Sequence, residues 1–350
     1  MAAIQTFPLL GLPDDVVLRT LRVMDLKQIF MFSLISKRCK DLLSSIQIKG
    51  TSFSVLIGSS ITIHIGTVSS RMSFSYYMEP DMYWGVGAYG RKKRLTPPQS
   101  VLIDEDIAEQ LARHPSELKK CDLEMKAWLE HLQCVFNYHR IDNIWFGENS
   151  SEFDIDDLKE AFGNIAEVYI ENTGCLAFNQ MILRHFFPIE ELTIMTDDFQ
   201  DSKIPLNLLM QNLVTLNIVE VVPTNITLND LLLINSKVIT VETPQLPRKL
   251  LNKFIKLWQK GSNPHMEYLC IDYANGEENE EHSIMKGINH KINPLNRVRN
   301  FKVSSNYLRP ARGGMDIYRM DGVRATITYR KSHDFSVWEL FVWMDHCVVE

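Results

Sequence analysis

The sequence predicts an α+β protein whose longer, C-terminal part is α/β, and three observations carry this prediction. Apolar residues at helical spacing near the N-terminus predict a small helical unit. Alternating apolar and polar residues from Phe53 to Tyr76 predict a short antiparallel β region. Beyond them, pairs of apolar residues recur every 24 residues, which predicts a repetitive α/β solenoid. We expect the three regions at residues 5–48, 49–140 and 141–350.

Three short helices are expected in the first region. Pro13 suits the first helical position, because an N–H there has no partner within the helix and Pro has none to leave unbonded. Asp14 and Asp15 place negative charge at the N-terminal end of the helix dipole, where it is favourable. Asp25 and Ser36 are suited to cap the second and third helices. The apolar residues at helical spacing are Val17, Leu18, Leu21, Met24, Leu26, Ile29, Phe30, Leu34, Leu42, Leu43 and Ile46. Their core is too small to stand alone, so a partner or the rest of the chain must cover it.

The second region begins with strands joined by Gly-Ser turns. Their apolar residues alternate at period 2: Phe53, Val55, Ile57, Ile61, Ile63, Ile65, Met72, Phe74 and Tyr76. A loop with four consecutive basic residues, Arg91–Arg94, follows. We interpret this loop as solvated; a nuclear import signal and a phosphate contact are the alternatives. The pattern from about Asp104 to His139 then predicts a helical region broken near Pro115.

The third region shows the repeat. Its apolar pairs are Ile144/Phe146, Val168/Ile170, Leu192/Ile194, Leu216/Ile218 and Ile239/Val241, with Leu269/Ile271 and Phe301/Val303 at longer spacing. Helical patterns lie between them, for example from Phe178 to Phe186 and from Leu251 to Trp258. A strand and a helix every 24 residues are typical of leucine-rich repeats, although the consensus Asn is missing, so we expect a leucine-rich-repeat-like parallel sheet backed by helices. The alternative is a non-repetitive α/β domain with coincidental spacing.

The end of the chain departs from the repeat. Residues Ile317–Ile327 predict a β-hairpin around Asp321-Gly322, a dipeptide suited to a tight type I′ turn. Phe335–Trp343 predicts a further strand. These strands would cover the last open edge of the solenoid, which otherwise invites aggregation.

Composition narrows the function. The net charge of −6 argues against binding to nucleic acid or to membranes through bulk electrostatics. Six scattered cysteines without a Cys-x-x-Cys pair indicate reduced thiols in the cytosol or nucleus. Pro8 and Pro13 interrupt the first apolar stretch, so no signal peptide is expected, and no apolar run approaches membrane-spanning length.

Motifs that suggest an enzyme are weak. Gly85–Gly90 matches G-x-G-x-x-G, but Pro97 and Pro98 follow where a nucleotide site needs a helix. His131 and Cys134 are capable of binding metal, yet no second ligand pair accompanies them. We therefore expect no catalytic residues, no metal and no cofactor. An enzyme that uses the Gly85 loop or the His131/Cys134 pair is the remotest alternative.

Residues Leu12–Lys40 resemble an F-box without a gap, from the Leu-Pro opening to the Ile35-Ser36-Lys37-Arg38 close, and depart from the motif at Asp15, Thr20, Met24 and Cys39. The resemblance implies binding to the Skp-type adaptor of SCF ubiquitin ligases. The residues that it assigns to adaptor binding are Leu12, Pro13, Leu18, Leu21, Met24, Leu26, Ile29 and Ile35. The alternative is an ordinary helical subdomain packed on the rest of the chain.

The remainder of the chain resembles F-box-associated domains of type 2. The resemblance rests on Trp128–Leu132, on Ile144-Trp145-Phe146 and on the ending from Met315 to Ile327. Together the two resemblances imply a non-enzymatic substrate-recognition subunit that joins a target protein to the cullin–RING ligase core. An interaction scaffold that holds the adaptor without ubiquitinating a target is the alternative.

Target binding is expected on the sheet face that the core residues leave exposed. Residues between and beside the apolar pairs point outward. They form a row of Trp145, Tyr169, Thr193 and Asn217, flanked by Glu167, Glu191 and Glu171, with Tyr268 and Asp272 further along. Aromatic residues among acids suggest a target with a basic segment. The alternative is that a neighbouring loop covers Trp145 and Tyr169.

Overall fold

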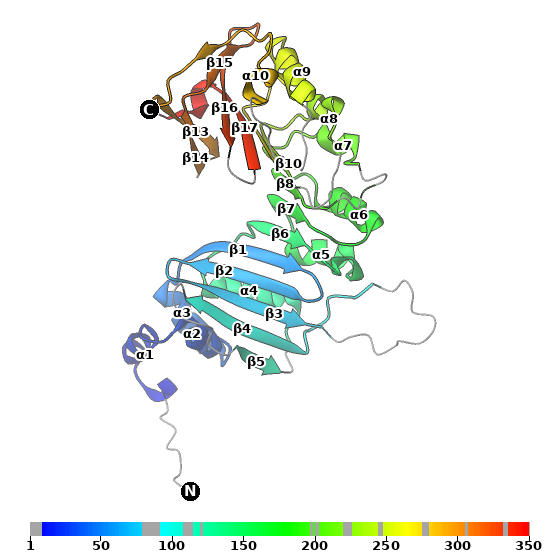
Figure 1. Cartoon of the computed structure of the whole chain (residues 1–350). Helices are drawn as coiled ribbons and strands as arrows, with labels where there is room; N and C mark the ends of the chain where they lie inside the picture. Colours follow the sequence, from blue (N-terminus) through cyan, green and yellow to red (C-terminus); the bar gives the residue numbers. More distant parts are fainter. Residues whose placement is uncertain are drawn as a thin grey trace. The chain divides into compact units, whose positions relative to one another are not determined.

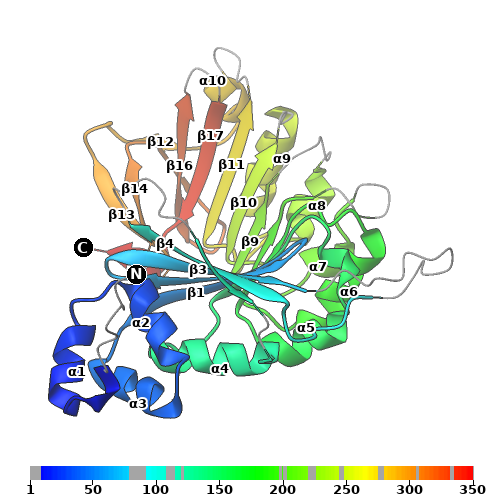
Figure 2. The same cartoon turned by 90° about the horizontal axis from the view of Figure 1, so that it is seen from below.

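The computed structural model describes residues 9–78, 92–107, 115–119, 122–196, 199, 203–219, 226–243, 248–274, 280–304, 307–331 and 335–349. The chain divides into two compact units, shown in Figures 1 and 2. Unit 1 comprises residues 1–165 and 184–186, and unit 2 comprises residues 166–183 and 187–350. Unit 1 thus joins the expected helical and β regions and also takes in residues 141–165, which the sequence assigned to the repeat. Among the described helices, none combines the length and the apolar character needed to cross a membrane.

The helical part of unit 1 has the three expected helices. After a 3-10 turn, η1 (Leu9–Gly11), the helices are α1 (Asp14–Leu21), α2 (Leu26–Ser33) and α3 (Lys37–Ile46). Both predicted side-chain caps are confirmed: the Asp25 carboxylate accepts the Gln28 N–H at 2.7 Å, and the Ser36 hydroxyl accepts the Cys39 N–H at 3.2 Å. Pro13 stands one residue before α1, at its N-cap.

The β region of unit 1 is one sheet in the order β6-β1-β2-β3-β4-β5, antiparallel except for the parallel pair β1–β6. Its predicted apolar residues are buried on one face, where α2 and α4 cover them. Phe30 of α2 lies 4.7 Å from Phe74 of β3 between ring centroids, and Tyr76 lies 5.5 Å from Trp128 of α4. The sheet and α4 thus cover the side of α2 that carries Phe30. The strands are β1 (Gly50–Ile57), β2 (Ile61–Thr67), β3 (Ser70–Tyr77), β4 (Ser100–Ile107), β5 (Ser116–Lys119) and β6 (Asn143–Phe146).

The helical region expected from Asp104 to His139 is partly wrong. Residues 104–107 belong to strand β4, residues 116–119 form β5, and only α4 (Met125–Val135) is helical among the described residues of this stretch. Pairing with β3 along the whole of β4 outweighs the local pattern there. The unit also contains η2 (Ser150–Glu152) and α5 (Ile155–Phe162), which the Asp154 side chain caps.

The repeat in unit 2 forms a parallel sheet with helices between its strands. Val168, Leu192, Leu216, Ile239 and Leu269 occupy one register line across β7 to β11, which is the alignment that the sequence spacing predicts. The leucine-rich-repeat-like assignment remains a prediction. The elements are β7 (Glu167–Ile170), α6 (Leu176–Phe186), β8 (Glu191–Ile194), α7 (Leu206–Leu209), β9 (Thr215–Ile218), α8 (Leu228–Leu233), β10 (Val238–Thr243), α9 (Arg248–Gln259) and β11 (Tyr268–Ala274).

Antiparallel strands continue this sheet beyond β11, in the order β11-β17-β16-β15-β12. The hairpin and the further strand are confirmed, but the turn is different: Gly322 N–H bonds to the Arg319 carbonyl, and only Gly322 of the Asp321-Gly322 pair has positive φ, +89°. A type I′ turn needs positive φ at both central residues, so Asp321-Gly322 is not such a turn. The elements are α10 (Glu280–Ile284), β12 (Lys291–Ile292), β15 (Met315–Tyr318), β16 (Arg324–Lys331) and β17 (Phe335–Val342).

Phe301 and Val303 do not continue the repeat, contrary to expectation. They lie in β13, the middle strand of a separate antiparallel sheet whose strands are β13 (Val298–Ser304), β14 (Tyr307–Arg312) and β18 (Val348–Val349), the last following η4 (Asp345–Cys347). Phe301 packs against Tyr268 and Phe341 of the main sheet, at centroid distances of 6.0 and 5.4 Å. The small sheet therefore covers one end of the main sheet.

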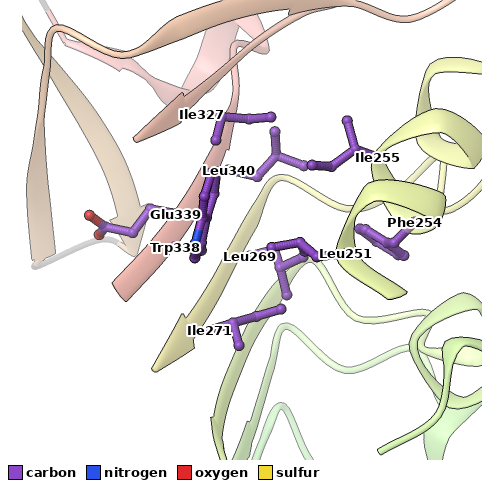
Figure 3. A pocket seen from close by; sticks show the side chains of 9 residues that line it. All are labelled: Leu251, Phe254, Ile255, Leu269, Ile271, Ile327, Trp338, Glu339 and Leu340. Carbon is purple, nitrogen blue, oxygen red and sulfur yellow. The ribbon is translucent and has the colours of Figure 1, made fainter. Parts of the chain in front are cut away.

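Helix α9 packs on the face of the main sheet that is opposite to the small sheet. A gap of about 10 Å³, roughly the volume that one water needs, remains there and is lined by apolar side chains (Figure 3). Figure 3 shows the Glu339 carboxylate directed away from α9. This gap is a packing defect of the core and offers no room for a ligand.

Candidate functional site

The first candidate surface is formed by helices α1 to α3. Their apolar residues divide into an enclosed set and a surface set. The enclosed core consists of Val17, Leu21, Ile29, Phe32, Cys39, Leu42 and Leu43. Leu21 is 0% exposed and Ile29 is 5% exposed, so these two predicted adaptor-binding residues support the surface from below.

The other predicted residues reach the surface to different degrees. Leu12, Leu18, Met24 and Leu26 are half-buried and pack against the enclosed core. Pro13 is exposed, and Ile35 is 63% exposed although it is a large aliphatic residue. Single exposed aliphatic residues are common on protein surfaces, so it is this group of residues together that favours a partner.

Two further surface residues escaped the sequence analysis. Val16 is exposed on α1, and Val23, directly after that helix, is 84% exposed. The sequence did indicate these residues, because both valines lie outside the helical spacing of the core residues. Apolar residues outside that spacing cannot join the core of the helices and favour contact with another surface. A groove between α1 and α3 is lined by other residues, among them Leu18, and the Arg38–Asp14 ion pair of 2.8 Å joins these helices.

The second candidate surface is the polar face of the parallel sheet in unit 2. Tyr169, Thr193 and Asn217 are cross-strand neighbours on β7, β8 and β9, as predicted. The Asn217 amide donates to the Thr193 hydroxyl at 3.1 Å, which aligns the row. Trp145 lies in β6 of unit 1, where it is half-buried and pairs with Leu56 of β1.

The acidic flank of this face shifts the pKa values of its own side chains. Glu167 and Glu191 are direct cross-strand neighbours, and the Tyr169 hydroxyl donates to Glu167 at 3.5 Å. Burial, followed by the charges of Glu167 and Glu191, raises the pKa of Tyr169 to about 12. Burial and the charges of Glu167 and Glu190 raise the pKa of Glu191. The neighbouring carboxylates contribute to both shifts after burial, and their charges favour a cation on this surface.

Glu171, the residue directly after β7, is exposed. Thr193 is only 6% exposed, so at most a small part of its side chain can contact a ligand. Asp272 of β11 is half-buried and is the cross-strand neighbour of Glu242 in β10. Burial and then the charge of Asp272 raise the pKa of Glu242, whereas burial raises the pKa of Asp272 against the opposing charge of Arg330. Glu242 and Asp272 therefore form a second acidic pair, near the C-terminal ends of β10 and β11, and Arg330 offsets part of its charge.

Tyr268 is not exposed on this surface, contrary to its expected position. It is 4% exposed beneath β13, and its hydroxyl donates to Glu339 at 2.7 Å. Arg309 and Arg330 also bond to Glu339, at 2.7 and 2.9 Å, so this buried carboxylate is neutralised and hydrogen-bonded. The small sheet, which the sequence did not predict, is the reason for the burial of Tyr268.

The alternative chemical motifs of unit 1 have structural roles where the structure describes them. His131 is buried with Nε2 2.7 Å from the Ser33 hydroxyl, and Cys134 lies 3.4 Å from the Ser44 hydroxyl. In the basic run, Lys93 pairs with Glu152 at 2.5 Å and Arg94 with Asp157 at 2.7 Å. The Gly85–Gly90 motif and Arg91 lie outside the described residues.

Comparison with known proteins finds two domain families on this chain. Residues 9–49, from η1 to the end of α3, match the F-box domain family. Residues 204–271, from α7 into β11, match the family described as F-box associated. This chain combines an F-box with an F-box-associated domain. A relative from Caenorhabditis elegans, F-box associated domain-containing protein sdz-33, is 23% identical over 267 residues, which cover 76% of this chain and 78% of the relative. No solved structure matches the chain.

Proposed function

We propose that this chain is a non-catalytic substrate-recognition subunit of an SCF-type ubiquitin ligase, acting in the cytosol, the nucleus or both. The F-box carries this proposal, because it leaves aliphatic side chains on its surface after its own core and the contacts with the β sheet are complete. The Skp-type adaptor is the partner that the F-box implies, and the cullin–RING core would join through that adaptor.

The proposed adaptor surface consists of Leu12, Pro13, Leu18, Met24, Leu26 and Ile35, with Val16 and Val23 added from the structure. Full burial of one aliphatic side chain contributes about 1.5–3 kcal/mol, so several of these residues must be covered together to offset the cost of association. Leu21 and Ile29 would hold the helices in register beneath that surface.

The proposed target surface is the acidic face of unit 2 around Glu167, Tyr169, Glu171, Glu191 and Asn217, with Thr193 at its base. Trp145, in unit 1, stays a separate proposed contact. A basic segment of a target suits the negative potential of the acidic face. No bond is made or broken by this chain in such a complex. It raises the effective concentration of target lysines near a conjugating enzyme.

Binding of purified Skp-type adaptor to the full chain tests the proposal. Val16→Asp with Ile35→Asp places charges on the exposed surface without touching the core, whereas Leu21→Asp would unfold the helices. Leu123→Asp is the matched control, because Leu123 is also exposed and apolar in unit 1 but lies outside the helices. We expect binding by the wild type and the control and at least a tenfold loss in the double variant.

Two outcomes would redirect the proposal. If the wild type does not bind the adaptor, the helices are a structural cap of the sheet. If the adaptor binds but the complex never incorporates cullin, the chain is an interaction scaffold.

For the target surface, Glu167→Lys with Glu191→Lys should abolish a preference for Lys/Arg-rich over acidic peptides on an array, and the control Glu160→Lys on α5 should keep it.

A further inference from the structure

Unit 2 brings together three metal-binding donors that lie far apart in the sequence. Glu267 stands directly before β11, whereas His346 and Cys347 lie in η4. Their donor atoms all lie within 4.8 Å of one another. His346 Nε2 is 3.1 Å from Glu267 Oε1, and Cys347 Sγ is 3.5 Å from Glu267 Oε2.

These distances approach the edges of a tetrahedral zinc site. Bonds of about 2.0–2.3 Å at tetrahedral angles place neighbouring ligand atoms roughly 3.4–3.6 Å apart. The two contacts reach different oxygens of Glu267, so binding of an ion through a single oxygen needs a rotation of the carboxylate. The fold brings one donor atom of each of the three residues within 4.8 Å of the others, which is close to the size of such a site.

We propose that Glu267, His346 and Cys347 form a Zn²⁺ site with a water molecule as the fourth ligand. Thiolate, imidazole and carboxylate together are donors that zinc accepts, whereas magnesium and calcium prefer oxygen alone. This inference goes beyond the proposed ligase role and does not depend on it.

Charge and proton balance set the conditions for binding. The Cys347 thiol must release its proton to water as its sulfur bonds to the ion, so affinity rises with pH. Lys237 competes, because its Nζ lies 3.3 Å from Glu267 Oε1. The lysine side chain is 53% exposed and is able to turn into solvent when the ion replaces it.

The site has a structural consequence within unit 2. Cys347 precedes β18, which pairs with β13 of the small sheet, whereas Glu267 precedes β11 of the main sheet. An ion held by both segments would tie the end of the chain to the main sheet. Because the ion binds the folded state, it would also raise the stability of this unit.

Titration of the full chain with Co²⁺ and then Zn²⁺ tests the inference. A thiolate–cobalt charge-transfer band in the near ultraviolet reports Cys347, and competition with a chromophoric chelator gives the zinc affinity. His346→Ala is the principal variant, because His346 is exposed and its loss leaves the fold intact. Cys347→Ser is the second variant, and Cys175→Ser and His265→Ala are matched controls in unit 2.

We expect one zinc ion per chain, affinity at least tenfold weaker in both site variants, and no cobalt–thiolate band in Cys347→Ser. Lys237→Met should bind zinc more tightly than the wild type. The inference is overturned if the wild type binds zinc no better than His346→Ala, or if the thiolate band survives in Cys347→Ser.

Discussion

His131 should make the stability of unit 1 depend on pH. Its ring is 8% exposed and lies edge-on to Phe30, with 5.7 Å between the centroids. The Ser33 hydroxyl donates to the Phe30 carbonyl, so we assign the hydrogen bond of 2.7 Å as donation from His131 Nε2 to Ser33. The neutral ring satisfies this arrangement, and protonation would add a charge to a buried site. Burial and then the positive charge of Lys40 lower the pKa of His131 from 6.5 to about 4.

The sign and the size of the effect follow from this pKa. The unfolded chain binds more protons than the folded chain between pH 6.5 and pH 4, so stability falls as pH falls through this window. At pH 5 the unfolded histidine is almost wholly protonated and the folded one almost wholly neutral. The population ratio of about 30 corresponds to an upper limit of about 2 kcal/mol lost between pH 7 and pH 5.

Amide hydrogen exchange of β2 and β3 measures the loss, because these strands pack in the same unit as His131. Opening free energies are compared at pH 7 and pH 5 after correction for intrinsic exchange. His131→Gln is the control, since its amide keeps a donor for Ser33 and does not titrate in this range. We expect a larger loss on acidification in the wild type than in His131→Gln. Equal losses in the two proteins would refute the assignment of a buried neutral histidine.

Three further predictions concern caps, turns and buried charge. Asp25→Ala removes the cap of α2 and should lower the free energy of unfolding of unit 1 by about 1 kcal/mol in urea denaturation. Gly314→Ala places a Cβ against the Ile327 carbonyl oxygen at φ +81° and should lower the melting temperature of unit 2 by several degrees. Glu339→Gln removes the buried charge that faces Arg309 and should cost about 3 kcal/mol, measured by chemical denaturation.

Each of these changes has a matched control. Asp41→Ala, on the exposed side of α3, should change stability by less than about 0.5 kcal/mol. Gly163→Ala also has positive φ, +70°, but its Cβ meets no atom within 4 Å, so it should cost less than Gly314→Ala. Equal costs at the two glycines would contradict the steric argument. Full stability of Glu339→Gln would show that the carboxylate is dispensable.

Much of the local structure was predictable because its signals lie within a few residues. The capping carboxylate of Asp25 and the hydroxyl of Ser36 mark helix starts by bonding to an N–H three residues later. The 24-residue spacing predicted which residues of β7, β8 and β9 become neighbours, because equal repeats place equivalent positions side by side in a parallel sheet. The F-box was recognisable for the same reason, since its motif is continuous.

The tertiary structure alone decided which of those residues a partner can reach. Leu21 and Ile35 are both apolar in the sequence, yet packing of three helices encloses the first and leaves the second exposed. Tyr268 occupies an outward position of its strand, but β13, some thirty residues later, covers it. The cluster of Glu267 with Cys347 joins residues eighty positions apart. Helix periods and caps are local properties, whereas burial and donor geometry depend on contacts between distant segments, which no local pattern encodes.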